Sequence, residues 1–122
     1  MSQENELPPW LKEQISRLQQ LQQNLQAIMV QKQQIELEIV ETDRALEELN
    51  KTKSSDSIYK TAGPLLIKTE KADVEKELAE KKELANTRVM VLGKQESRVK
   101  ENLKEVENKI NQMIKGAPPS QQ

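Results

Sequence analysis

The sequence predicts a mainly α-helical protein, a long antiparallel two-helix coiled coil with one short β-hairpin between the helices. The chain of 122 residues is 34% hydrophobic, 32% charged and only 2% aromatic. This composition is too polar for an ordinary globular core and is typical of long helices. Apolar residues recur every seven positions on both sides of residues 57–69, which indicates a coiled coil rather than disorder. Residues 57–69 alone have the pattern of a strand, a turn and a strand.

The first helix is expected over residues 10–53, after a polar start at residues 1–9. Pro8 and Pro9 suit a first turn, where a missing N–H costs little. No Gly or Pro interrupts the helix, and two rows of positions keep a heptad over six repeats. Lys32 on this seam is expected either to fix the register or to extend its ammonium into solvent. The two rows are Leu11, Leu18, Leu25, Lys32, Ile39 and Leu46, and Gln14, Leu21, Ile28, Ile35, Thr42 and Leu49.

A hairpin is predicted over residues 57–69, with Ala62-Gly63-Pro64 between two strands of roughly four residues. A two-stranded hairpin this short is marginal in water and leaves two unpaired edges, so we expect it to pair with strands of other subunits. The alternative is a tight loop that only joins the helices. The candidate assembly residues are β-branched, aromatic or leucine side chains and the turn glycine: Ile58, Tyr59, Gly63, Leu65, Leu66 and Ile67.

The second helix is expected over residues 70–115, with Thr69 as its N-cap and Glu70 and Asp73 in its first turn. Gly93 lies inside this helix and permits either a close approach or a slight bend. Gly116 and two prolines after it end the helix, so residues 116–122 are expected to be a disordered tail. A mixed row runs from Glu75 to Ile110. The continuous seam row is Leu78, Ala85, Leu92, Val99, Val106 and Met113.

The composition excludes several classes of function. The chain has no Cys and no His, which removes thiol nucleophiles, Cys/His zinc sites and imidazole catalysis. The carboxylates lie on open helix surface and no phosphate-binding glycine loop exists, so we expect no enzyme activity, catalytic residue, metal or cofactor. Basic residues are interleaved with acids at a net charge of −1, which does not favour nucleic acid. A polar N-terminus and no apolar run of about 18 residues argue against membranes and predict a cytoplasmic protein.

The ends of the two helices farthest along the chain from the hairpin carry more apolar residues than the seam needs. An antiparallel coil brings these ends together, and exposed apolar patches often bind partners. The alternative is that these residues only plug the end of the coil, and the sequence favours neither. The Gln-rich stretch between Gln19 and Gln34 is interpreted as a solvated face. We term the apolar group the tip cluster: Leu7, Trp10, Leu11, Ile15, Ile110, Met113 and Ile114. Three of them, Leu11, Ile110 and Met113, belong to the seam, and the other four flank it and are expected to be partly exposed.

The hairpin contains a Tyr-Lys-x-x-Gly-x-Leu-x-x-Lys spacing, formed by Tyr59, Lys60, Gly63, Leu65 and Lys68. With its two flanking heptad helices, this motif resembles a beta-class prefoldin subunit of archaeal type. Gln31-Lys32-Gln33 and the segment 45–49 are also similar to that family. The resemblance covers residues 11–114, and a single hairpin points to the beta class.

The resemblance implies a subunit of a hexamer with two alpha-class and four beta-class members, whose hairpins join into inter-subunit β-barrels. It implies that the tip cluster holds unfolded polypeptides, without nucleotide, and that the complex delivers them to a group II chaperonin. The chain is then an ATP-independent chaperone subunit. The alternative is a structural coiled-coil adaptor that binds one defined partner.

Overall fold

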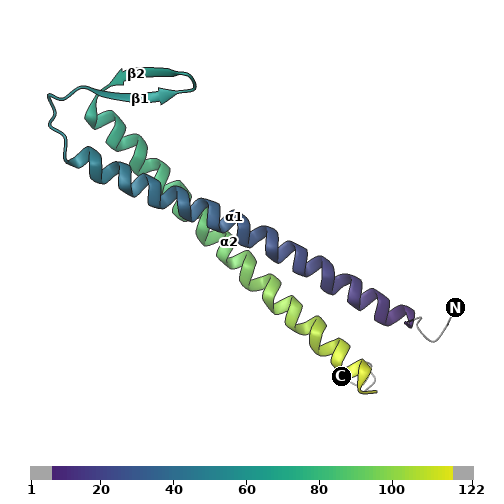
Figure 1. The fold of residues 1–122 in the computed structure, drawn as a ribbon. Helices are drawn as coiled ribbons and strands as arrows, with labels where there is room; N and C mark the ends of the chain where they lie inside the picture. Colours follow the sequence, from purple (N-terminus) through teal and green to yellow (C-terminus); the bar gives the residue numbers. More distant parts are fainter. Residues whose placement is uncertain (1–6, 117–122) are drawn as a thin grey trace. The chain divides into compact units, whose positions relative to one another are not determined.

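The computed structural model describes residues 7–116, so the expected polar residues 1–6 and tail residues 117–122 lie outside the described part. The order of elements is α1 (Pro9–Asn50), β1 (Ile58–Ala62), β2 (Leu65–Thr69) and α2 (Lys71–Ile114). Figure 1 shows two long helices, with the hairpin β1–β2 where the chain passes from the end of α1 to the start of α2. The predicted fold class is therefore confirmed. The joining of hairpins between subunits stays a prediction.

The chain divides into two compact units, and both helices contribute to each. Unit 1 combines residues up to Gln31 with residues from Leu92 onward, and unit 2 spans Lys32–Val91. In unit 1, Arg17 shares a groove with Lys109, whereas residues 24–31 share another with residues 95–99. Residues later in α1 therefore face residues earlier in α2, so the helices are antiparallel in this unit.

The helices of unit 2 are also antiparallel. The Lys82 ammonium lies 2.6 Å from the Asp43 carboxylate, and the Lys71 ammonium donates a hydrogen bond of 2.8 Å to the Thr52 carbonyl. The second contact joins the second residue after α1 to the first residue of α2. It therefore fastens the two ends of the connecting segment to each other.

The helix starts follow from local capping. The Pro8 carbonyl accepts the N–H groups of Leu11 and Lys12, both at 3.0 Å, and Pro9 takes the first helical position, which suits its fixed φ. In α2 the Glu70 carbonyl accepts the Val74 N–H at 3.1 Å. Glu70 is thus the N-cap residue of α2.

The prediction of Thr69 as the N-cap was wrong. Thr69 is the last residue of β2 and pairs with Ile58, so strand pairing occupies its backbone. Asp73 does lie in the first turn of α2, as predicted.

The end of α1 differs from the prediction by one turn, because α1 stops at Asn50 instead of residue 53. The N–H groups of Lys51 and Thr52 bond to carbonyls only three residues back, at 3.2 and 3.1 Å, which tightens and closes the helix. The Thr52 hydroxyl donates a further bond of 2.6 Å to the Leu49 carbonyl. The Asp56 carboxylate accepts the Lys53 N–H at 2.7 Å, and the Asp56 N–H bonds to the Lys53 carbonyl at 3.0 Å, so Asp56 closes the turn that follows.

At its other end α2 stops at Ile114, one residue short of the predicted 115. The Gly116 N–H bonds to the Met113 carbonyl at 3.1 Å, and Gly116 has a φ of +86°. This left-handed glycine caps the last turn as its position in the sequence predicts.

The hairpin has five residues in each strand, one more than predicted, because Ala62 pairs with Leu65 instead of joining the turn. The two turn residues are Gly63 and Pro64. Gly63 has a φ of +60° and proline holds φ near −65°, a combination that matches a type II′ turn and excludes type I′. The turn therefore suits the twist of a tight antiparallel hairpin.

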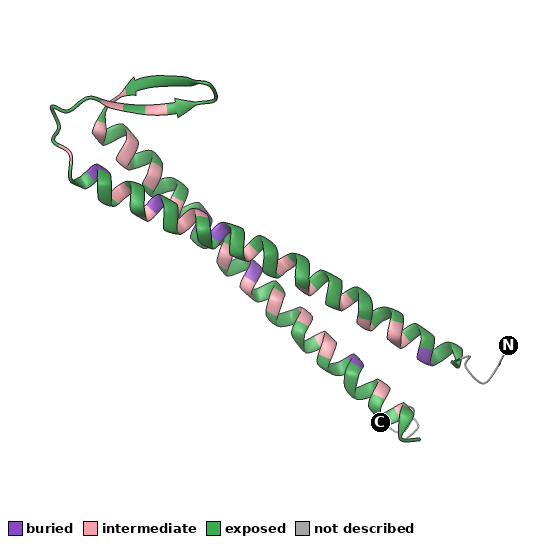
Figure 2. Cartoon of the chain, in the orientation of Figure 1, coloured by how far each residue is buried: buried purple, intermediate pink, exposed green. Residues whose placement is uncertain are grey.

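One stripe on each helix forms the core. Every predicted seam position of both helices is buried or half-buried, and Figure 2 shows these residues on the sides where the helices meet within each unit. Thr42 is buried on the seam, and its hydroxyl donates a bond of 2.7 Å to the Glu38 carbonyl. Among residues 7–116, the buried apolar residues are Leu11, Ile35, Leu49, Ala85, Leu92 and Val106.

Gly93 does not serve a close approach, because a Cβ built there meets nothing within 4 Å. The replacement Gly93→Ala should therefore raise the free energy of unfolding, by up to about 1 kcal/mol, since alanine has the higher helix propensity. Urea unfolding followed by circular dichroism at fixed protein concentration measures the change. Gly63→Ala is the opposing control and should be destabilising, because φ at Gly63 is +60°. An unchanged or lower stability of Gly93→Ala would show that the glycine has a structural task.

Candidate functional site

The tip cluster lies entirely in unit 1, with members from the start of α1 and from the end of α2. Its seam members are covered: Leu11 is buried, and Ile110 and Met113 are half-buried. The flanking members are open, with Trp10 at 43% and Ile114 at 67% exposed. Leu7 is exposed and Ile15 half-buried, so the expected split between seam and flank is present. The exposed members are available for contact with another molecule.

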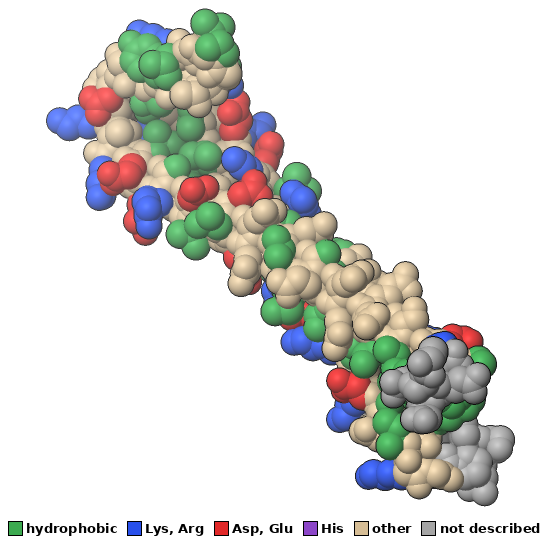
Figure 3. All heavy atoms as spheres, turned by 45° about the vertical axis from the view of Figure 1, so that its right-hand side comes forward, with side chains coloured by type: hydrophobic (Ala, Val, Ile, Leu, Met, Phe, Trp, Pro, Cys, Tyr) green, Lys and Arg blue, Asp and Glu red, His purple; other side chains and the backbone are tan. Residues whose placement is uncertain are grey.

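The hairpin exposes apolar side chains on both of its faces. Alternation along the strands puts Tyr59 and Leu66 on one face and Leu65 and Ile67 on the other. All four are exposed, and Leu66 is the most open at 71%. Figure 3 shows hydrophobic side chains gathered on the hairpin and again around the helix ends of the tip cluster.

One face of the hairpin is turned toward α2. Lys60 lies on the face of Leu65 and Ile67, and its ammonium is 3.0 Å from the Glu77 carboxylate of α2. Ile58 on the same face is half-buried, whereas Tyr59 on the other face is open. The chain thus covers part of one face itself and leaves the other face and both strand edges uncovered.

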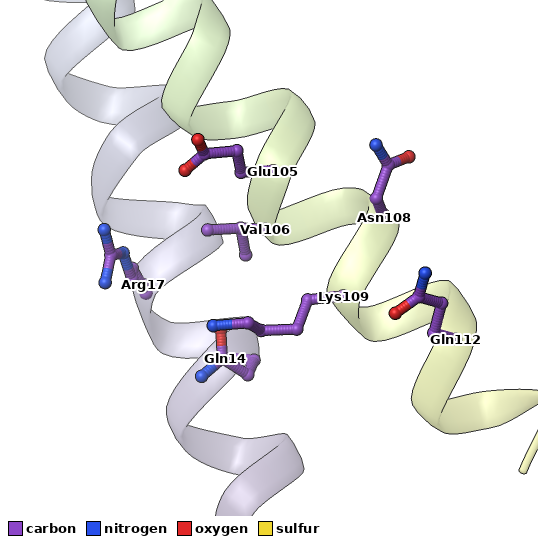
Figure 4. Close-up of a pocket in the computed structure, with 7 residues that line it drawn as sticks. All are labelled: Gln14, Arg17, Glu105, Val106, Asn108, Lys109 and Gln112. Carbon is purple, nitrogen blue, oxygen red and sulfur yellow. The ribbon is translucent and has the colours of Figure 1, made fainter. Parts of the chain in front are cut away.

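A groove of about 390 Å³ opens between the helices in unit 1, close to the tip cluster along both helices (Figure 4). Val106 lines it and is only 4% exposed. Lys109 extends from α2 toward Gln14 of α1. The other lining residues are polar or charged: Arg17, Glu105, Asn108 and Gln112.

Sequence reasoning missed this groove, although one signal was present. Gln14 occupies a seam position, where a larger apolar residue elsewhere fills the space between the helices. Arg17 and Lys109 each stand directly before a seam residue and so lie along its edge. A polar seam residue flanked by cations is the pattern that predicts such an opening.

A second groove in unit 1 has a volume of about 400 Å³ and lies farther along both helices toward the middle of the chain. Asn24, Ile28 and Gln31 line it from α1, and Arg98 and Val99 line it from α2. Gln31 belongs to the Gln-rich stretch that the sequence suggested as a plain solvated face. All glutamines of this stretch are exposed, as predicted, and Gln31 also lines the groove because its edge of α1 faces α2.

The site chemistry is that of binding. In residues 7–116 no group of three or more acidic, histidine or cysteine side chains is arranged to hold a metal ion. The Lys51 ammonium bonds to the Glu48 carboxylate and lowers the pKa of Glu48, and Glu48 in turn raises the pKa of Lys51. Both groups are exposed at the end of α1, outside both grooves and the tip cluster.

No helix in the described part of the chain is long and apolar enough to cross a membrane.

Comparisons with known proteins match almost the whole chain. A profile of the family described as "Prefoldin subunit" matches residues 12–117. "Prefoldin subunit beta" of Archaeoglobus fulgidus is 41% identical over 109 residues, which cover 89% of this chain and 94% of that protein. The protein of the same name from Thermococcus onnurineus is 39% identical with the same two coverages.

Two solved structures are similar as well. The crystal structure of the prefoldin beta subunit from Thermococcus strain KS-1 has a TM-score of 0.81 at 35% identity, and covers 93% of this chain and 98% of that chain. The prefoldin beta2 subunit of the same strain has a TM-score of 0.67 at 25% identity, with coverages of 75% and 97%.

Proposed function

The chain belongs to the prefoldin family and is a chaperone subunit, and we propose that it holds unfolded polypeptides at its tip cluster without ATP. The observation that carries this proposal is the exposure of Leu7, Trp10 and Ile114 beside a seam that does not use them. Unfolded polypeptides expose apolar side chains that folded proteins bury. Contact with the tip cluster removes apolar surface of both molecules from water, which is favourable by about 25 cal/mol per Å².

Each such contact is small, and we propose that several subunits act on one client. Linked weak sites gain affinity because the later contacts become intramolecular. The tip cluster suits varied clients, since methionine and a single tryptophan adapt to different apolar surfaces. Release then needs only the loss of a few contacts, and we propose that a group II chaperonin receives the client.

The proposed assembly is a hexamer of two alpha-class and four beta-class subunits, joined by their hairpins into β-barrels. Support comes from the apolar side chains exposed on both hairpin faces and from the two unpaired strand edges. A two-stranded sheet gains stability once further strands cover it. The proposed place of action is the cytoplasm, and the proposed role is not enzymatic.

The tip cluster is tested by removing its exposed side chains and keeping the seam. The double replacement Trp10→Ser and Ile114→Ser should raise the amount of chaperone needed to prevent aggregation of an unfolded client by about tenfold. Light scattering of chemically unfolded clients diluted into the assembled complex measures this. Leu84→Ser is the matched control, because Leu84 is 63% exposed on α2 but lies outside the tip cluster.

Protection by the double variant equal to that of the parent would contradict tip binding. Protection of one partner protein only, with a fixed stoichiometry, would favour the structural adaptor instead.

The hairpin is tested by charge. Leu66→Asp should prevent assembly with an alpha-class subunit, because the aspartate would be buried between strands without a partner. Native mass spectrometry gives the masses, and circular dichroism should show unchanged helix content, since Leu66 is open within one chain. Leu84→Asp should assemble normally. A hexamer of normal mass containing Leu66→Asp would rule out the hairpin as the joint.

A further inference from the structure

We propose that the two grooves of unit 1 hold an acidic, extended segment of the client whose apolar segment lies on the tip cluster. The inference rests on the proposed function and adds to it a preference for the charge of the client. The inference assigns a role to the polar residues that line the two grooves, which tip binding leaves without one.

The two grooves lie on the same edge of the helix pair. Arg17, Asn24 and Gln31 recur every seven residues, each directly before a seam residue of α1. Gln95 and Lys109 stand directly before seam residues of α2. In an antiparallel pair these two edges face each other, so the grooves follow one another along a single side of the coil.

This edge continues into the tip cluster. Trp10 stands seven residues before Arg17 and therefore lies on the same edge of α1. The opposite edge is apolar at the tip, where Ile15 and Ile114 each follow a seam residue. An extended client that contacts Trp10 can therefore continue along the same edge into the first groove. A client that contacts Ile15 and Ile114 lies on the opposite edge, which is apolar at the tip.

The charges of the grooves favour carboxylates. The cations that line them are Arg17, Lys109 and Arg98, against one acid, Glu105. None of these three cations forms an ion pair or a side-chain hydrogen bond with any residue between 7 and 116. Their charge is therefore available to an external anionic group, and guanidinium and ammonium groups bond strongly to carboxylates.

The amides of the grooves suit a polypeptide main chain. A carboxamide offers two N–H donors and a carbonyl acceptor, which complement the C=O and N–H groups of an extended peptide. Gln14, Asn24 and Asn108 supply such groups along the grooves. An unfolded segment has unpaired peptide groups throughout, so amides add attraction with little demand on sequence, while the cations select for acidic side chains.

The test uses the assembled complex and fluorescent, unstructured peptides that share one apolar segment. The segment is followed by aspartates, by serines or by lysines, and fluorescence anisotropy gives the dissociation constants. At low salt the aspartate peptide should bind about three- to tenfold more tightly than the lysine peptide. About 0.3 M salt should remove most of this preference, because the pairs are exposed.

A matched pair of variants locates the effect. Arg17→Gln with Lys109→Gln should abolish the charge preference and leave the affinity for the serine peptide unchanged. Lys12→Gln with Lys104→Gln removes the same charge from exposed positions that follow seam residues and line neither groove. This control should keep most of the preference.

The outcomes separate the two proposals. If the serine peptide binds but the aspartate and lysine peptides bind equally, or if both double variants lose the preference alike, the groove inference is overturned and tip binding stands. If no peptide binds the parent complex, tip binding fails and the groove inference fails with it. A preference lost only in the groove variant supports the inference.

Discussion

The narrowness of the apolar seam governs this molecule. Two helices in contact can cover only one stripe each, and no side chain of the described residues is fully enclosed. Apolar residues beyond that stripe, such as Trp10, Leu66 and Ile114, have nowhere to be buried within the chain. Hydrophobic surface left exposed in this way is removed from water only by contact with other molecules. The proposed association through the hairpin and the proposed client binding at the tip cluster thus have one geometric cause.

The heptad pattern made the coil predictable, because burial in a two-helix coil depends on spacing more than on composition. Even the polar seam residues follow the heptad pattern. The Thr42 hydroxyl donates a hydrogen bond to a carbonyl of its own helix, and Lys82 of α2 forms an ion pair with Asp43 of α1. The hairpin was predictable for a similar reason, since Gly63 and Pro64 together admit few turn types. The two predictions depend on patterns within a single element, namely the seven-residue period along each helix and the two adjacent turn residues.

The features that were not predicted depend on competition between local bonds or on space between the helices. The Thr52 hydroxyl closes the end of α1 and Asp56 closes the turn after it, through side-chain bonds that no periodicity signals. Strand pairing occupies Thr69, which the sequence suggested as a helix cap. The tip cluster and its division into covered seam members and more open flanking members could both be predicted, because the heptad separates seam positions from their neighbours. The grooves required both helices at once, because Gln14 opens a space only where Val106 and Lys109 stand opposite.

The fastening of Lys71 to the Thr52 carbonyl has a consequence for how such subunits diversify. Since this hydrogen bond holds the end of α1 next to the start of α2, the residues between them form a unit that can be exchanged as a whole. Strands could be added, exchanged or shortened there during evolution, and the register of the coil would be kept. The hairpin, which is proposed to join subunits, and the tip cluster, which is proposed to bind clients, can then change under separate selection.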